Sequence, residues 1–145
     1  MSNNNESATF NAKAWYESIR EMVTELEASR EAADDMDREE AAQQRIHESV
    51  LSVEVRSGWY SPQYPEHQKP EEYLILLTTG GPALRLIGDL DEYGQPETAR
   101  LEYQDWGTPW TEYNPGHHDD AFKPEDYDAY DSTLLAFASC FYFGE

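Results

Sequence analysis

The amino-acid sequence predicts an α+β fold, in which a four-stranded antiparallel sheet at about residues 50–106 carries two N-terminal helices and one C-terminal helix packed on it. Three observations lead to this prediction. Apolar residues recur every three or four positions before residue 49 and again after residue 124, which is the period of a helix. Between these segments the period changes to two, as in a half-buried strand. The 145 residues are 39% hydrophobic and 13% aromatic, which is enough for the core of one domain.

The first helix is predicted from about residue 11 to about residue 30. Its apolar stripe includes Trp15, Ile19, Met22 and Leu26, which are separated by steps of three and four residues. The polar residues 1–9 are expected to form a disordered lead. The single folded domain is therefore expected to span residues 10–145.

A second helix is predicted after a break near residues 34–35. Asp37 and Glu40 have the spacing of a capping box, and the helix is expected to end near residue 49. Its apolar stripe is limited to Ala42, Ile46 and Val50. We therefore expect this helix to pack at the edge of the core.

Four strands are predicted from the period-two alternation and from the turn residues between the apolar runs. Gly80, Gly81 and Pro82 form a hairpin turn, and Gly94 lies in the next one. The predicted strands cover residues 50–56, 73–78, 83–90 and 98–106. All neighbouring strands in this order are expected to be antiparallel.

Two long connections and a last helix complete the predicted fold. Residues 58–70 are expected to form a loop stapled by Trp59, Tyr60 and Tyr64, and residues 107–123 form a polar connection. The last helix is predicted from its apolar spacing, with the residues Tyr127, Tyr130, Leu134, Phe137, Ala138 and Phe141. It is expected to pack on the sheet.

The chain is strongly acidic along its whole length. It has 30 acidic and 10 basic side chains, for a net charge of −20, and residues 1–49 alone hold twelve acids and five bases. Such a surface repels phosphate, so direct binding to nucleic acid or an anionic membrane is disfavoured, and a charged partner should be basic. Adaptation to high salt remains an alternative explanation of the acidity. No signal peptide or membrane span is recognised, and a cytoplasmic protein is expected.

The sequence offers few residues for catalysis or for a cofactor. His117, His118, Asp119 and Asp120 are metal-ligand types, but adjacent side chains in a loop diverge, so no metal site is predicted. Cys140 lies in an apolar segment, where burial makes a thiol unreactive. The protein is therefore expected to be neither an enzyme nor the carrier of a cofactor.

The spacing of carboxylates on the first helix is the positive functional signal. Glu17, Glu21 and Glu25 stand four residues apart, so like charges lie roughly 6 Å apart on one side of the helix, where they cost stability. A row at this spacing is comparable with the charges of a nucleic-acid strand. The first helix and the turn after it thus supply one set of candidate partner-binding residues: Glu17, Glu21, Glu25, Glu31, Asp34, Asp35 and Asp37.

A second acidic run precedes the last helix and is interleaved with tyrosines. Carboxylates next to tyrosines are typical of protein interfaces, although a solvated loop beside core tyrosines has the same composition. The candidate partner-binding residues from this run are Asp119, Asp120, Asp126 and Asp128. Two more aromatic residues, Trp106 and Trp110, flank a Gly-Thr-Pro bend and are open to either a core or an interface role.

Residues 73–83, 101–110 and 141–145 look like segments of uncharacterised proteins of plasmids and phages. In size, acidity and mixed α+β character the chain resembles the small DNA-mimicking inhibitors with which phages and plasmids oppose restriction, CRISPR and other nuclease systems. The resemblance implies an anti-CRISPR or antirestriction role. Its implied partner is a basic nucleic-acid-binding protein or complex of a bacterial defence system.

The sequence therefore favours a non-enzymatic inhibitor that occupies a basic nucleic-acid-binding site and blocks DNA or RNA access. An alternative is an immunity protein that neutralises a basic toxin or nuclease through an acidic and aromatic interface, where Trp59, Trp106 or Trp110 would matter more. An enzyme that uses carboxylates or the residues 117–120 is a third, weaker reading. The oligomeric state does not follow from the sequence.

Overall fold

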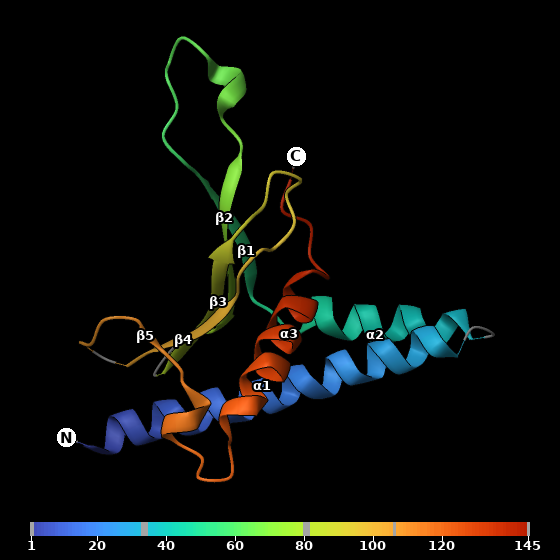
Figure 1. The fold of residues 1–145 in the computed structure, drawn as a ribbon, viewed down its shortest axis with the longest axis vertical. Coiled ribbons are helices and arrows are strands. Elements are labelled where there is room, and N and C mark those ends of the chain that lie inside the picture. The colour runs from blue at the N-terminus through green and yellow to red at the C-terminus, as the bar shows by residue number, and fades with distance from the viewer. Residues whose placement is uncertain (1, 33–34, 80–81, 106, 145) are drawn as a thin grey trace.

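The computed structural model describes residues 2–32, 35–79, 82–105 and 107–144, and of residues 2–6 only the backbone is considered. Its helices and strands confirm the α+β class (Figure 1). In chain order they are α1 (Ser2–Glu31), α2 (Met36–Glu48), β1 (Ser52–Ser57), η1 (Pro65–His67), β2 (Pro70–Thr78), β3 (Ala83–Asp89), β4 (Arg100–Gln104), β5 (Thr111–Glu112), η2 (Pro115–His117), η3 (Pro124–Asp126) and α3 (Tyr127–Ala138).

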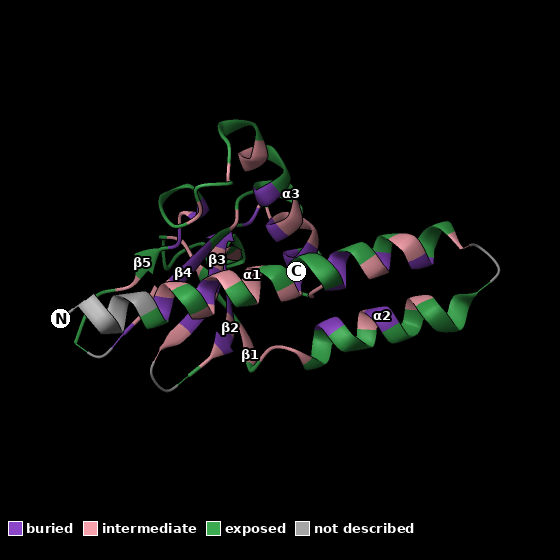
Figure 2. Cartoon of the chain, turned by 90° about the horizontal axis from the view of Figure 1, so that it is seen from below, coloured by how far each residue is buried: buried purple, intermediate pink, exposed green. Residues whose placement is uncertain are grey.

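The long first helix, α1, begins nine residues earlier than predicted. It includes the polar lead that we expected to be disordered, because Ala8 and Ala12 continue the buried stripe toward the N-terminus. Ile19, Met22 and Leu26 of the predicted stripe are also buried. At 30 residues the helix is about 45 Å long, and one half of it extends well beyond the sheet (Figure 2).

The second helix, α2, runs antiparallel beside the outer half of α1 and not on the sheet, which corrects the prediction (Figure 2). Its N-cap is Asp35, whose carboxylate accepts the backbone N–H of Arg38 at 3.0 Å, in place of the predicted box of Asp37 and Glu40. Ala42 and Ile46 are its buried residues, as its weak apolar stripe predicted. We call α1 and α2 with their connection the helical hairpin.

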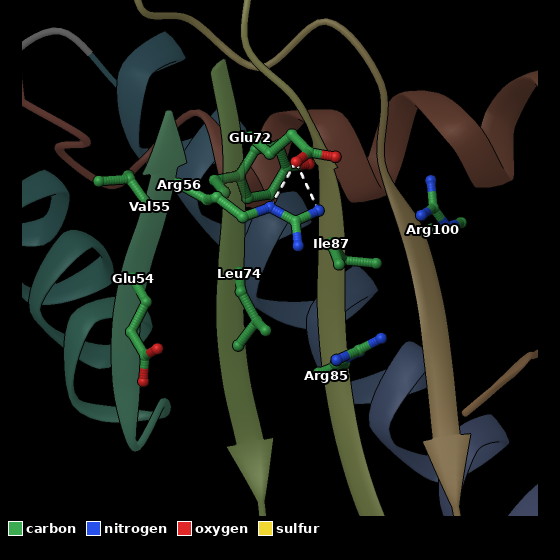
Figure 3. A pocket seen from close by; sticks show the side chains of 9 residues that line it. Glu54, Val55, Arg56, Glu72, Leu74, Arg85, Ile87 and Arg100 are labelled. Atoms are coloured by element: carbon green, nitrogen blue, oxygen red, sulfur yellow. Dashed lines mark hydrogen bonds and ion pairs between the residues drawn. The ribbon is translucent and has the colours of Figure 1, made fainter. Parts of the chain in front are cut away.

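The sheet is an antiparallel meander in which the strands follow the order β1-β2-β3-β4-β5. The prediction of four strands is wrong by one, because β5, which pairs with β4 through Glu102–Glu112 and Tyr103–Thr111, follows the predicted last strand. One face of the sheet carries α1 and α3. On the other face a depression is lined by residues of the strands alone, and we call this face the open face (Figure 3).

The core lies between the sheet and the helices. Tyr73, Ile75, Leu84, Leu86 and Leu101 from the strands are at most 1% exposed. They meet the buried stripes of α1 and of α3, where the predicted residues Tyr130, Leu134, Phe137 and Ala138 are buried. This continuous core joins the sheet and α3, which we call the body of the molecule.

Gly88 allows a close backbone crossing at the end of β3. The Tyr73 hydroxyl donates a hydrogen bond of 2.6 Å to the carbonyl of Thr98, and both groups lie beside the Gly88 Cα. A Cβ at residue 88 would lie 2.0 Å from the Thr98 carbonyl oxygen, which no side chain tolerates. Glycine is therefore required at this position.

The connection between β1 and β2 projects away from the body, and we call residues 58–69 the arm (Figure 1). The predicted stapling by aromatic side chains does not occur, since Trp59, Tyr60 and Tyr64 are all exposed. Tyr64 stacks on His67, with ring centroids 5.4 Å apart. The arm thus presents aromatic surface to solvent.

Candidate functional site

The row of carboxylates on α1 does not stay on one side of the helix. Successive residues at four-residue steps advance by about 40° around an α-helix. Glu17 is exposed beside a depression that α1 shares with the 113–133 segment, whereas Glu25 faces α2. The structure therefore places the predicted row partly on the surface and partly in the seam of the helical hairpin.

Ion pairs across this seam neutralise two of the three carboxylates. The Arg38 guanidinium donates to both oxygens of Glu25, with the shortest contact at 2.6 Å from Nη2 to Oε1. Arg45 lies 3.9 Å from Glu21. A third pair, between Arg30 and Glu39, has a distance of 3.5 Å. The two helices are thus cross-linked by charge.

The strongest of these pairs changes the acidity of both partners. The hydrogen bond from Arg38 holds the pKa of the Glu25 carboxyl below its ordinary value of 4.5. The same contact raises the pKa of Arg38. Glu25 thus remains ionised, but its charge is committed to Arg38.

At the far end of the helical hairpin, three of the predicted residues form what we call the tip cluster: Glu31, Asp35 and Asp37. All three are exposed, and Asp35 also caps α2. Glu31 and Asp37 form no ion pair with a described residue. Asp34, also predicted, lies outside the described residues. The tip cluster is therefore a compact source of negative charge.

The second acidic run lies beside the first half of α1. Glu17, Asp119 and Asp126 line one depression of about 310 Å³ between α1 and α3. Lys13 forms an ion pair with Asp119 at 3.8 Å, and the Asp126 carboxylate accepts the backbone N–H of Lys123. With the exposed residues Asp120 and Asp128 nearby in the chain, these acids make up the body cluster: Glu17, Asp119, Asp120, Asp126 and Asp128.

The pKa of Tyr113 responds to the negative charges of the body cluster. Its ring is buried at the depression, and burial raises the pKa of its hydroxyl to about 12, with the negative charges of Asp119 and Glu17 adding to the shift. The Tyr130 hydroxyl donates to the Tyr113 carbonyl at 3.3 Å. The tyrosines of this segment therefore serve the core, while its carboxylates face solvent.

The candidate surface consists of two negative clusters, and each of them includes one carboxylate of α1. Glu17 and Glu31 are fourteen residues apart, which corresponds to about 21 Å along α1. Between them lie Glu21 and Glu25 with their arginine partners. The sequence predicted a nearly continuous row, whereas the structure separates its two ends by a charge-paired middle.

The residues considered for metal binding or nucleophilic chemistry do not assemble into a site. Within the described ranges, no group of three or more His, Cys, Asp or Glu side chains is arranged to hold a metal ion. His118 instead stacks on Tyr113, with ring centroids 5.8 Å apart. Burial raises the pKa of the Cys140 thiol, whose Sγ contacts the Ala136 carbonyl at 3.3 Å.

The open face of the sheet is a feature that the sequence analysis missed. Arg56, Arg85 and Arg100 surround Leu74 and Ile87 in a shallow depression of about 520 Å³ (Figure 3). The strand period of two would have found it, because every second residue of β2 and β3 must face away from the helices.

Carboxylates accompany the arginines of the open face. Glu102 accepts from Arg85 at 2.8 Å and from Arg100 at 3.2 Å, and Glu72 pairs with Arg56. The Arg85 guanidinium also lies 4.1 Å from the ring centre of Trp110. Trp110 is therefore half-buried against the sheet, whereas Trp106 lies outside the described residues.

Comparisons with known proteins add no relative. No protein-family model, no curated protein and no solved structure matches the chain. Among the described residues, no helix combines the length and the apolar character needed to cross a bilayer.

Proposed function

We propose that this protein is a non-enzymatic inhibitor that mimics nucleic acid and binds a basic nucleic-acid-binding site of a bacterial defence nuclease or surveillance complex. The tip cluster and the body cluster are its contact surfaces. By occupying the basic groove, it keeps DNA or RNA out.

One observation carries this proposal: most basic side chains of the helical hairpin already form ion pairs with acidic residues of the same chain. Four of the five basic residues in the first 49 are in ion pairs, namely Lys13, Arg30, Arg38 and Arg45. The acids of the tip and body clusters are in excess over these bases and face solvent. The fifth base, Arg20, is exposed and lines the same depression as Glu17, so the outward surface of the hairpin is anionic in net charge and carries one unpaired arginine among its described residues.

The geometry of α1 supports the comparison with a nucleic acid. Glu17 of the body cluster and Glu31 of the tip cluster lie about 21 Å apart along α1, which corresponds to about six base-pair rises of 3.4 Å. Because helix α1 is fixed on the body, this separation is set before binding. A pre-organised anionic surface gains attraction from a basic groove and loses little conformational entropy.

An immunity protein that neutralises a basic toxin is the second candidate, and the arm favours it. Trp59 is fully exposed and Tyr64 is half exposed, next to His67. Exposed aromatic side chains are frequent anchors of tight protein interfaces. In that case the arm supplies the affinity and the acidic clusters only accelerate encounter.

Affinity capture separates these candidates. The tagged full-length chain is incubated with bacterial lysate, bound proteins are eluted by raising salt from about 0.05 M to about 1 M, and competing duplex DNA is added in parallel. Mimicry predicts a nucleic-acid-binding partner that is released by salt and displaced by DNA. A partner that resists both and is lost with Trp59→Ala would establish the immunity reading instead.

Charge-reversal variants then test the surface itself. The variant Glu17→Lys/Glu31→Lys/Asp120→Lys changes three carboxylates that form no ion pair with a described residue. Glu21 and Glu25 stay native because they pair with Arg45 and Arg38 of α2. The matched control, Glu66→Lys/Glu92→Lys/Glu97→Lys, changes the net charge equally on the arm and the β3–β4 connection. Capture should be lost only in the first variant. Equal loss in both would show that total charge, and not this surface, governs binding.

A further inference from the structure

Exposed apolar side chains gather along one edge of the sheet. Among the described residues nine large hydrophobic side chains are exposed, and five of them belong to β1, its flank and the arm: Leu51, Val55, Trp59, Tyr60 and Tyr64. β1 is the outermost strand, and its Val55 points away from β2 (Figure 3). An edge strand with exposed apolar residues is a template for pairing with another strand.

The sequence of this edge is complementary to itself. Glu54 and Arg56 lie on the open face and flank Val55. If two copies of β1 pair antiparallel about a twofold axis at Val55, Glu54 of each copy stands opposite Arg56 of the other. Both cross-strand pairs are then of opposite charge, as an isologous interface requires.

The apolar residues follow the same register. Val55, 44% exposed, meets its own counterpart at the axis, and Val53 stands opposite Ser57. Leu51, 60% exposed, precedes the strand and lies next to the same edge. The axis thus gives a partner to Val55, the exposed apolar residue of β1 itself.

We propose that two copies of this chain dimerise edge to edge through β1, so that their five-stranded sheets join into one. Arg56 already pairs with Glu72 of its own chain, and its side chain remains 73% exposed. Glu54 of the second copy reaches this exposed side. The arginine then lies between two carboxylates.

Salt separates this dimer from the proposed inhibitory complex. Each copy carries a net charge of −20, so two copies repel each other at long range. The strand β1 itself holds one Glu and one Arg, whose charges cancel. Screening by salt removes the general repulsion and leaves strand pairing and apolar contact, so dimerisation should strengthen as salt rises, whereas capture by a basic groove should weaken.

Sedimentation equilibrium of the isolated full-length chain tests the proposal, from about 0.05 M to about 1 M salt. A dimer that tightens with salt is expected. A monomer at every salt and protein concentration would overturn the proposal, even if β1 were found to pair with a strand of another protein. A dimer that weakens as salt rises would overturn it as well.

Two single variants and their mixture test the register. Glu54→Arg alone and Arg56→Glu alone each place like charges opposite each other twice, and each should dimerise about tenfold more weakly or worse. In a mixture of the two variants both pairs are again of opposite charge, so the heterodimer should form. Because each variant is checked for folding on its own by circular dichroism, failure of the mixture would refute this register.

The control variant Glu92→Arg changes the net charge as Glu54→Arg does, but at a position away from the edge. It should dimerise as well as the native chain or more tightly, since it lowers the overall repulsion. Weakening equal to that of Glu54→Arg would show that the effect is not specific to β1.

Discussion

The helical hairpin and the sheet both contain Arg–Glu ion pairs, but these pairs differ in how far they are exposed to solvent. In the hairpin the paired side chains are between 36% and 74% exposed. On the sheet Glu102 is only 11% exposed and Arg85 19%. Water and salt screen an exposed pair, whereas a shielded pair that loses one member leaves a poorly solvated charge. The hairpin pairs therefore set geometry, and the sheet pair belongs to the structural framework.

The two regions also differ in how much apolar surface holds them. α2 contributes Ala42 and Ile46 to the buried interior, whereas the body buries residues from three strands, α1 and α3. Excess carboxylates on α2 and on its connection to α1 consequently burden a part of the chain that buries few apolar side chains. An acidic surface can be extended there without weakening the core.

The largest difference between the regions should appear when apolar groups are removed. Leu84→Ala deletes a fully buried side chain between β3 and the helices and should lower the free energy of unfolding by about 2–5 kcal/mol. Met36→Ala, at an exposed site in α2, should change it by less than about 0.5 kcal/mol. Urea unfolding followed by circular dichroism measures both. Similar losses would mean that the exposed Met36 side chain of α2 contributes as much stability as the buried Leu84.

An intermediate effect is expected for the shielded ion pair. Glu102→Gln removes the charge that Arg85 and Arg100 share and should cost about 1.5–3 kcal/mol, because hydrogen bonds to charged groups are lost in a poorly hydrated place. Glu72→Gln, which affects the more exposed pair with Arg56, is the matched control and should cost less. The midpoints of urea unfolding give the ranking, and the reverse order would contradict the comparison.

The smallest effect belongs to the exposed pair of Glu25 and Arg38, and it depends on pH. The folded pKa of Glu25 is lowered, so its stabilisation is complete above pH 4.5 and is lost as the pH falls through the folded value. Carboxyl NMR should find Glu25 titrating below 4.5, and Arg38→Gln should return it toward 4.5. Arg56→Gln is the control that should leave Glu25 unchanged. If the pKa of Glu25 did not change in Arg38→Gln, the hydrogen bond from Arg38 would not be the cause of its lowering.

The sequence predicted those elements whose apolar period is long and regular. The stripe of α3 and the continuous apolar run of β2 were sufficient, because a long uninterrupted apolar pattern marks a buried element directly. The sequence did not predict β5 because this strand has only two residues, both of them exposed. The start of α1 escaped because its buried positions are filled by the small residues Ala8 and Ala12 among polar ones.

The sequence could predict which acidic residues belong to the candidate site, but not which basic residues would form ion pairs with them. The four-residue spacing located Glu21 and Glu25 correctly on α1. Their partners Arg38 and Arg45 come from α2, and only the packing of the two helices decides which carboxylates meet them. The convergence of Glu17 with Asp119 and Asp126 likewise depends on where α3 docks. Local periodicity contains no information on such contacts.

Gly88 has a consequence for tracing the ancestry of this chain. Surface acids can be exchanged freely during evolution, and a partner that changes will change them. The crossing of Thr98 over Gly88, tied by the Tyr73 hydroxyl, leaves no room for any side chain and so resists drift. A tyrosine in one strand, a glycine fifteen residues later and a backbone acceptor ten residues beyond form a better fingerprint for distant kin than acidity does.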